Sequence, residues 1–450
     1  MTTKGKLILL IVLSTLIGFI ASYVLIDITE KKLEQKNPFF KVVEIDPLED
    51  DPAIWGKNFP HQYETYLKTV DQERTKYGGS EALPRTPSEA DPRSIVAQSK
   101  LEEDYRLKLM WAGYAFSHDF REERGHAYML DDQIYTKRQE FSPQPGACIN
   151  CHASTYVPMM KLGKGDLIKG FHALNKMPYD EAHKNVNHPI SCIDCHSPDT
   201  MELRITKPAF MEGIKKFKKT QGIENYDVNK MASRQEMKTF VCAQCHVEYY
   251  FKGEEKTLTF PWDNGLKADQ VLAHYRENQH YDWIHKETGA KMLKAQHPEF
   301  ELWSQGTHAQ AGVSCVDCHM PYQRLGAMKI TNHQVRSPLL NINKSCQTCH
   351  QAPENDLRMR VETIQDRHME MRNTAMNAVV ELIASIKKAQ KKKISDDKIK
   401  KAQVAHREAQ FLIDYVEAEN SMGFHAPQEA ARLMVKAMDL IRKAQSELND

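Results

Sequence analysis

Three features typical of common functional classes are absent from this chain. Its 450 residues carry 61 Lys plus Arg against 60 Asp plus Glu, and the resulting formal charge of +1 gives no electrostatic footprint for nucleic acid. No glycine-rich phosphate loop and no Ser-His-Asp pattern is visible. With 41% hydrophobic and 27% charged residues, the composition argues against both a disordered chain and a multi-span membrane protein.

Cysteine is absent outside one short pattern, Cys-x-x-Cys-His, which uses all 10 cysteines. Its occurrences are Cys148-Ile-Asn-Cys151-His152, Cys192-Ile-Asp-Cys195-His196, Cys242-Ala-Gln-Cys245-His246, Cys315-Val-Asp-Cys318-His319 and Cys346-Gln-Thr-Cys349-His350. This pattern is the attachment signature of c-type haem. The two thiols lie about one helical turn apart and can form thioethers to both vinyl groups of one porphyrin, and the adjacent His supplies an axial nitrogen to the iron.

Zinc and disulfides are the alternative explanations of the pattern. Zinc ribbons use two Cys-x-x-Cys units per metal, so five units cannot pair without a remainder. Disulfides would not require a His after every second Cys. The sequence therefore predicts five covalently attached haems c. Because each macrocycle is a large apolar plate, the interior is built around the cofactors, and we expect the apoprotein to be poorly folded.

One long uncharged run lies near the N-terminus, from Leu7 to Ile26, and follows Lys4 and Lys6. It is long enough to cross a bilayer of about 30 Å and longer than the roughly 7–15 apolar residues of a cleaved signal. The segment around Ala21 is also a poor cleavage site. We therefore expect residues 1–28 to be a retained transmembrane anchor or uncleaved signal, with the haem-binding part facing the periplasm. A cleaved signal would give the same location.

The rest of the chain divides into three expected parts. A polar linker covers residues 29–58, a pentahaem catalytic core covers 59–358, and long helices cover 359–450. In the last part Ser395 indicates a helix start and Pro427 opens a final helix. Because strand signals are sparse, we expect a mainly α, compact multihaem c-type cytochrome.

Apolar residues recur at helical spacing in the C-terminal part. The two groups are Met376, Val379, Val380, Ile383 and Ile386, then Ala405, Ala409, Leu412, Ile413 and Val416. These stripes could be ordinary core or an oligomer interface, and the sequence alone favours core.

The number of histidines leaves the function open. Five hexacoordinate haems need ten axial ligands, of which the motifs provide five, and the chain has 20 His in all. The other fifteen histidines are enough to give every iron a second axial ligand. A protein that only transfers electrons therefore stays as possible as an enzyme with an open haem.

Longer segments resemble a known family. They are Cys242-Ala-Gln-Cys245-His246-Val-Glu248-Tyr249-Tyr250-Phe251, Lys294-Ala-Gln296-His297-Pro298, Arg124-Gly125-His126, Arg138, and Gly423-Phe424-His425-Ala426-Pro427. From about Trp111 to the C-terminus the chain resembles cytochrome c nitrite reductase, the pentahaem ammonia-forming enzyme. The resemblance implies an oxidoreductase that reduces nitrite to ammonium with six electrons.

The resemblance also implies a set of iron ligands. The first motif would carry the catalytic haem, bound by Cys148 and Cys151, with an open distal side. The implied distal ligands of the others are His126 for the Cys242–Cys245 haem, His333 for Cys192–Cys195, His425 for Cys315–Cys318 and His308 for Cys346–Cys349. Nine histidines then leave one coordination position free for nitrite.

The implied pocket consists of Arg138, Tyr249 and His297. A guanidinium and an imidazolium can hold an anion and stabilise charge as N–O bonds break, and His297 can donate protons. Without the resemblance, Arg138 could pair with a haem propionate, Tyr249 could be core and His297 could be a distal ligand. A calcium ion is implied beside the pocket, with side-chain oxygens from Glu248 and Gln296 and backbone carbonyls from Tyr249 and Lys294.

One residue departs from the usual family pattern. Most members have Lys as the proximal ligand of the catalytic haem, whereas this chain has His152, and the reduction potential of that haem should differ accordingly. The family further suggests a homodimer, with the C-terminal helices at its interface, and a membrane quinol-oxidising cytochrome as electron donor. The alternatives are a reductase or oxidase of another small species, such as hydroxylamine or sulfite, and a pure electron-transfer cytochrome.

Overall fold

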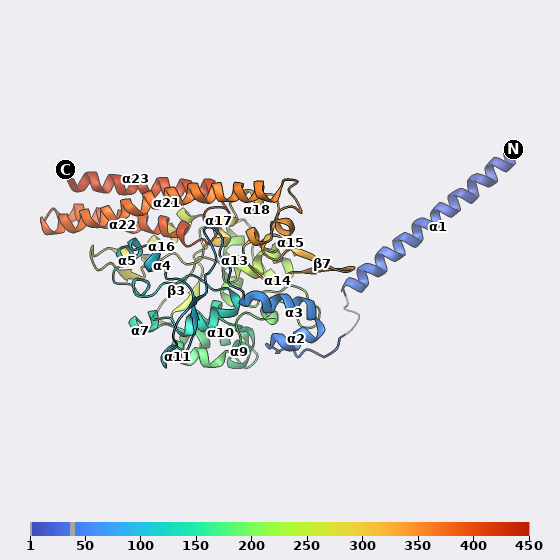
Figure 1. The fold of residues 1–450 in the computed structure, drawn as a ribbon, viewed down its shortest axis with the longest axis horizontal. Coiled ribbons are helices and arrows are strands. Elements are labelled where there is room, and N and C mark those ends of the chain that lie inside the picture. Colours follow the sequence, from blue (N-terminus) through green and yellow to red (C-terminus); the bar gives the residue numbers. More distant parts are fainter. Residues whose placement is uncertain (1, 37–40, 450) are drawn as a thin grey trace.

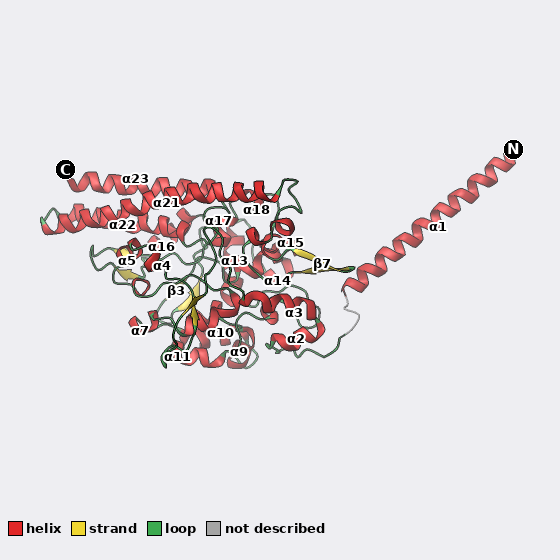
Figure 2. Ribbon diagram, viewed as in Figure 1, coloured by secondary structure: helices red, strands yellow, loops and turns green. Residues whose placement is uncertain are grey.

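The computed structural model describes residues 2–36 and 41–449, most of them in helices (Figures 1 and 2). A body of short helices and irregular chain lies against three long C-terminal helices, and one N-terminal helix stands apart (Figure 1). The prediction of a mainly α-helical protein is confirmed.

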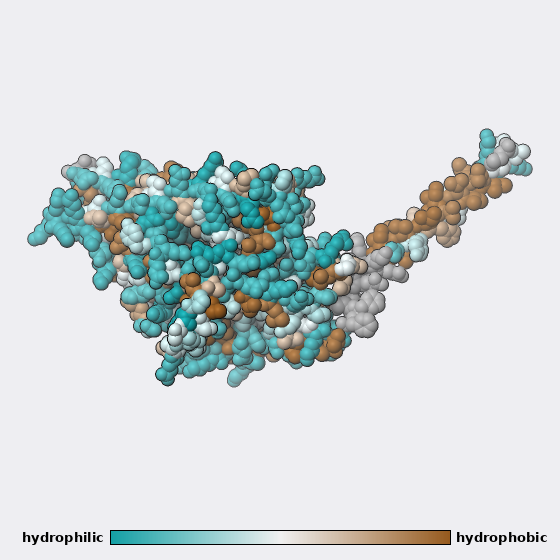
Figure 3. All heavy atoms as spheres, in the orientation of Figure 1, coloured by the Kyte–Doolittle hydropathy of each residue, from teal (hydrophilic) through white to brown (hydrophobic). Residues whose placement is uncertain are grey.

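The N-terminal helix α1 (Thr3–Lys36) contains the expected span. An 18-residue window within Thr3–Thr29 has a mean hydropathy of 2.6 and none of it is buried. Thr3–Thr29 is the one stretch of described chain long and apolar enough to cross a membrane. Figure 3 shows this helix as a brown apolar rod beside a largely hydrophilic body. Length and composition alone do not separate an anchor from a signal sequence.

The expected linker 29–58 is more ordered than its composition indicates. α1 continues to Lys36, and α2 (Pro52–Asn58) begins with a proline after Asp51, whose side chain accepts a hydrogen bond from the Ala53 N–H. Both ends of the predicted linker segment are therefore helical. Residues 37–40 of the linker lie outside the described residues.

The helices of the body are short. They are α2, α3 (Pro60–Leu67), α4 (Lys100–Glu103), α5 (Arg106–Met110), α6 (Met129–Ile134), α7 (Arg138–Phe141), α8 (Ile149–His152), α9 (Tyr156–Leu162), α10 (Leu167–Lys176), α11 (Tyr179–Ala182), α12 (Cys192–Cys195), α13 (Pro208–Thr220), α14 (Val228–Met231), α15 (Arg234–Ala243), α16 (Ala268–Glu277), α17 (Glu299–Trp303), α18 (Thr307–Gln310), α19 (Cys315–His319) and α20 (Ile342–Ser345). The 3₁₀ turns are η1 (Lys68–Val70), η2 (Ala115–Ser117), η3 (His126–Tyr128), η4 (Gly146–Cys148), η5 (His183–Asn185) and η6 (Pro338–Leu340).

Strands are few in the described chain and form only two-stranded antiparallel sheets. The pairs are β1 (Leu83–Pro84) with β2 (Ile95–Val96), β3 (Tyr250–Lys252) with β4 (Thr257–Thr259), β5 (Trp283–Ile284) with β6 (Lys291–Met292), and β7 (Tyr322–Leu325) with β8 (Met328–Thr331). The expectation of sparse strands is confirmed.

The C-terminal helices α21 (Glu354–Lys391), α22 (Asp396–Glu417) and α23 (Pro427–Asn449) pack against one another. α21 begins upstream of the expected boundary at residue 359. α22 starts after Ser395, whose side chain accepts a hydrogen bond from the Lys398 N–H, and Pro427 is the first residue of α23. Both predicted helix starts are confirmed.

The apolar stripes of these helices are core. Met376, Val379, Leu412 and Val416 are fully buried within this single chain, so the preference for ordinary core over an oligomer interface is confirmed for these residues. Their cluster also contains Trp111 and Tyr275 of the body, so the helices share one core with it. A second cluster surrounds the first Cys-x-x-Cys-His motif.

Candidate functional site

The first, second and fourth Cys-x-x-Cys-His motifs lie on short helical turns, the third lies at the end of α15, and the fifth lies in a turn after α20. Residues three positions apart on a helical turn share a face, so the two thiols of such a motif lie together. Two of these turns, α12 and α19, are fixed by capping boxes of Ser191 with Asp194 and Ser314 with Asp317. All ten cysteines are free, which excludes the disulfide alternative. No group of three or more His, Cys, Asp or Glu among the described residues could hold a metal by itself, so nothing supports protein-only zinc sites.

The structure brings four motif histidines opposite four histidines from elsewhere in the chain, with the two rings of each pair tilted or edge-on to each other. The distances between ring centres are 6.3 Å for His246 and His126, 6.4 Å for His196 and His333, 6.3 Å for His319 and His425, and 6.2 Å for His350 and His308. These are the pairs that the resemblance implied.

The spacing of these pairs fits one metal between two imidazoles. A metal–nitrogen bond of about 2 Å and about 1.2 Å from the nitrogen to the ring centre, counted on both sides, give about 6.4 Å. A different buried pair, His285 and His406, has ring centres only 4.9 Å apart. Its ring nitrogens bond within the protein, to the Leu109 carbonyl and to Gln410 among others. The ring nitrogens of that pair have hydrogen-bond partners within the core, so the pair needs no metal.

In several of the predicted iron ligands, the protein binds the ring nitrogen Nδ1 and leaves Nε2 free. Nδ1 bonds a backbone carbonyl in His152 (Met129, 3.2 Å), His196 (Met201, 2.8 Å), His319 (Arg336, 3.1 Å) and His333 (Thr331, 2.9 Å), and lies 2.6 Å from Glu419 Oε1 in His425. Metal-binding histidines use this arrangement because it fixes the ring and its tautomer. Nε2 is then the nitrogen available to a metal, and the donor set fits haem iron.

His152 of the first motif differs from the other four. No second histidine ring faces it among the described residues. His152 and Arg138 instead line one cavity of ≈ 30 Å³, together with Asp119 and Glu123. Tyr249 is half-buried against the apolar cluster that contains Cys148 and Cys151, and burial raises the pKa of its phenol well above the usual value.

Arg138 is the first residue of α7 and is held in place by neutral partners. Its guanidinium donates to the Asp119 carbonyl at 3.3 Å and lies 4.6 Å from the centre of the Phe116 ring. The Asp119 carboxylate also accepts a hydrogen bond from the Lys137 N–H at 2.9 Å, which fixes the start of α7. The positive charge of Arg138 is therefore not neutralised by an ion pair in the described chain.

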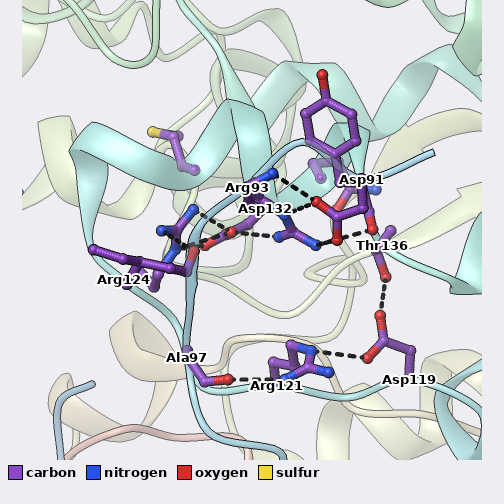
Figure 4. Close-up of polar contacts among 12 residues, drawn as sticks. Asp91, Arg93, Ala97, Asp119, Arg121, Arg124, Asp132 and Thr136 are labelled. Atoms are coloured by element: carbon purple, nitrogen blue, oxygen red, sulfur yellow. Dashed lines mark hydrogen bonds and ion pairs between the residues drawn. The ribbon is translucent and has the colours of Figure 1, made fainter. Parts of the chain in front are cut away.

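A network of acidic and arginine side chains supports the same region (Figure 4). Asp132 pairs at 2.8 Å with both Arg93 and Arg124, and Asp119 pairs with Arg121. Arg124 was noted in the sequence only as part of a family segment, and here it is buried and structural. The network fixes the chain on both sides of Gly125, whose φ of +89° permits the turn that begins at His126.

The segment before His297 is clamped by three carboxylates. Successive backbone N–H groups of Lys294, Ala295 and Gln296 donate to Asp282 (2.8 Å), Asp414 (2.8 Å) and Glu248 (2.6 Å) respectively. The Lys294 ammonium also pairs with Asp414 at 3.1 Å, and both groups are buried. Burial lowers the pKa of His297 itself to about 4, so its ring is neutral near pH 7 in these surroundings.

The predicted calcium ligands Glu248, Lys294 and Gln296 lie together. The Gln296 side-chain amide donates to the Lys294 carbonyl at 3.2 Å, and Tyr275 donates to Glu248 at 2.8 Å. Glu248 is fully buried, and burial raises its pKa to about 8. The hydrogen bonds that it accepts from the Gln296 N–H and from Tyr275 act in the opposite direction, because they favour the carboxylate. A buried carboxylate beside a carbonyl and an amide is a donor set that fits a hard dication.

Sequence reasoning missed Asp282 and Asp414. Asp414 lies on α22, 119 positions from Ala295, so no local motif connects them. One signal was available, because Asp414 interrupts the apolar run Phe411-Leu412-Ile413 and is followed by Tyr415 and Val416. A charged residue within a buried helical stripe is seldom left without a partner.

Comparison with known proteins identifies the family. The cytochrome c552 family profile matches residues 51–450. The chain belongs to the cytochrome c552 family. Cytochrome c-552 of Porphyromonas gingivalis is 35% identical over 97% of this chain and 83% of its own length, and that of Parabacteroides distasonis is 36% identical over 90% and 77%.

A solved structure shares the fold of this family member. The cytochrome c nitrite reductase of Desulfovibrio desulfuricans superposes with a TM-score of 0.76 at 29% identity, covering 90% of this chain and 87% of that one. That enzyme is described as having two calcium sites in its catalytic subunit. The expected multihaem cytochrome fold is confirmed, and the chain carries c-type haem.

Proposed function

We propose that this protein reduces nitrite to ammonium with six electrons at the haem held by Cys148, Cys151 and His152. One observation carries the proposal. Four motif histidines each face a second histidine at the spacing of a metal, whereas His152 faces none among the described residues and borders a cavity with Arg138. The similarity to the D. desulfuricans nitrite reductase supports the same substrate.

Five haems c, one per motif, would be held by the ten cysteines and by His152 and the four histidine pairs. Bound haem c would supply the iron that binds the substrate and would relay to it the electrons from the donor. His152 replaces the Lys of most relatives, and its imidazole, fixed by the Met129 carbonyl, gives that haem a different potential from an amine-ligated one. The protein would fix the rings and provide the pocket.

Arg138, Tyr249 and His297 would act on the substrate. The Arg138 guanidinium is held by a carbonyl and a ring face, so its charge remains to attract and orient an anion. Tyr249 provides a phenolic O–H, and the His297 ring provides an N–H. Because the three carboxylates fix residues 294–296, His297 keeps its position while protons are delivered.

A calcium ion would stabilise the base of the pocket. Glu248 and Gln296 would contribute side-chain oxygens, and Tyr249 and Lys294 backbone carbonyls. The support for this site is the fully buried Glu248 carboxylate, which accepts from the Gln296 N–H beside the Lys294 carbonyl and the Gln296 side-chain amide. A dication there would offset that charge and tie the chain that bears Tyr249 to the chain that bears His297.

The location and partners follow from α1 and from the family. The span Thr3–Thr29 would anchor the protein in the cytoplasmic membrane with the haem-binding body in the periplasm. A membrane quinol-oxidising cytochrome would supply electrons one at a time, and two copies of the chain would form a homodimer. The apolar length of α1 supports the anchor.

The test uses the purified, haem-loaded protein with a reduced viologen dye. We expect ammonium to appear in equal amount to nitrite consumed, and one haem to be high-spin while the others are low-spin. A protein with every haem low-spin and no nitrite turnover would be an electron carrier. Faster turnover of hydroxylamine or sulfite than of nitrite would identify a reductase of that species.

A further inference from the structure

The hairpin β7–β8 projects from the body and carries no described function. Its register pairs Tyr322 with Thr331, Arg324 with Lys329 and Leu325 with Met328, and leaves a two-residue turn of Gly326 and Ala327. Gly326 has φ of +58°, as the first central residue of a type II′ turn requires. The hairpin is therefore a regular element with a fixed tip.

The tip combines an apolar pair with a basic pair. Leu325 and Met328 oppose each other and are 37% and 50% exposed. One register step behind, Arg324 opposes Lys329, and like charges in that position destabilise a hairpin. Neither cation has an acidic partner in the described chain; Lys329 lies 4.1 Å from the centre of the Tyr322 ring. The stability of the hairpin does not explain this arrangement.

The hairpin lies at the end of the body at which the chain enters it after α1. Lys41 follows the last residue of α1 by five peptide steps, which span at most about 18 Å. The chain then enters α2 and α3, and α3 packs against β8. Just after β8, the His333 N–H donates to Thr65 of α3 at 2.9 Å. In Figure 1 the hairpin points from the body toward the lower end of α1.

We infer that the hairpin tip contacts the lipid bilayer. Leu325 and Met328 enter the boundary between headgroups and acyl chains, and Arg324 and Lys329 bind the anionic headgroup phosphates. The inference rests on the proposed anchoring by α1, and adds that a second contact fixes the orientation of the body on the membrane. An apolar tip backed by unpaired cations matches the charge and polarity of an anionic membrane surface.

The test places a photoreactive benzophenone amino acid at position 325 of the full, haem-loaded chain. The chain is reconstituted in vesicles of phosphatidylethanolamine and phosphatidylglycerol, illuminated, and searched by mass spectrometry for lipid adducts. The control carries the same group at Ile284, which is 56% exposed on β5. We expect at least about tenfold more lipid adduct at 325 than at 284. We also expect the yield of lipid adduct at 325 to be higher in these anionic vesicles than in phosphatidylcholine vesicles. The double variant Arg324→Gln with Lys329→Gln should remove that difference.

Three results would overturn the inference. One is a chain that stays with the vesicles yet forms no adduct at 325, and another is equal adduct at both positions. The third is illumination of native membranes that joins position 325 to a protein, which would assign the tip to a membrane partner. Loss of the chain from the vesicles altogether would instead refute the anchoring by α1. Fractionation before illumination distinguishes these failures.

Discussion

Between Lys41 and Pro353 no described helix exceeds the 13 residues of α13, whereas α21, α22 and α23 run for 38, 22 and 23 residues. Isolated helices shorter than about 12–15 residues are marginal in water, so the short helices depend on tertiary contacts. In the body those contacts include histidine pairs spaced for a metal. In the C-terminal helices they are buried apolar side chains such as Val379 and Leu412.

The comparison shows that helical content does not reveal the source of stability. The C-terminal helices carry continuous apolar stripes that bury one another, and their fold follows from side chains alone. The body has an apolar cluster of its own, and its cysteines and histidines add the attachment points for haem. Its structure should therefore depend on haem attachment much more than that of the C-terminal helices. The predictions below test this difference, from the largest expected effect to the smallest.

The largest effect should follow from preventing haem attachment. With Ser in place of all ten motif cysteines, we expect limited trypsin digestion to remove the body at least about ten times faster than the region from α21 to α23. The three helices bury apolar side chains against one another without haem, whereas the short helices of the body lose the cofactors that they pack around. The control is the matured protein, whose intact mass should exceed that of the polypeptide by five haems. A haem-free body as resistant as the matured one would contradict the comparison.

The second prediction concerns catalysis within the body. His297→Asn should leave all haems attached and reduce nitrite turnover by about 10²–10⁴, the range for losing a positioned proton donor. His172→Asn, at an exposed position, is the matched control and should have no effect. His126→Asn should instead convert a low-spin haem to high-spin. If His297→Asn creates a new high-spin haem, His297 is an axial ligand and the electron-carrier interpretation regains support.

The third prediction tests the connection between the two regions. Asp414 of α22 holds both the Lys294 ammonium and the Ala295 N–H, so Asp414→Asn leaves a buried cation without its partner. We expect the free energy of unfolding to fall by about 3–5 kcal/mol and calcium affinity to fall about 10–100-fold. Denaturant titration and calcium binding measure the two effects.

Asp439→Asn is the control for this prediction. Asp439 lies on α23 in exposed pairs with Arg442 and Lys443, and such pairs contribute about 0–1 kcal/mol. If Asp414→Asn lowers stability while calcium affinity stays unchanged, Asp414 has no role in positioning the loop before His297. Adding Lys294→Met to Asp414→Asn should restore part of the stability, because no uncompensated charge then remains buried.

The fourth prediction is a pH dependence within the C-terminal helices. Burial opposes the charge on Glu417, but its ion pair with Arg372 outweighs burial and lowers the pKa of the carboxyl. A carboxyl with a depressed folded pKa stabilises the protein above its unfolded pKa of about 4.3, and that stability is lost as pH falls through the folded pKa. Between pH 6 and 3, Glu417→Gln should therefore lose less stability than the unaltered protein, with a difference of about 2 kcal/mol.

Sequence reasoning succeeded where the chemistry is local. The haem motifs, the helix start at Ser395 and the proline at the start of α23 each depend on neighbouring residues, and all can be recognised without a structure. The histidine partners came from family resemblance, because His126 and His246 lie 120 positions apart and spacing cannot pair them. The order within the linker and the carboxylate clamp on residues 294–296 were missed because they depend on distant contacts such as that of Asp414.

The smallest effect should come from a single hydrogen bond at the start of α22. Ser395 is exposed, and its side chain accepts from the Lys398 N–H, so Ser395→Ala removes one cap while leaving the buried stripe intact. We expect a loss of about 1 kcal/mol in the free energy of unfolding, and no change in nitrite turnover, because the core of the three helices stays packed. Ser395→Asp retains an acceptor and should restore the stability. A loss as large as that of Asp414→Asn would show that the C-terminal helices depend on their ends more than on their apolar faces, and would weaken the contrast with the body.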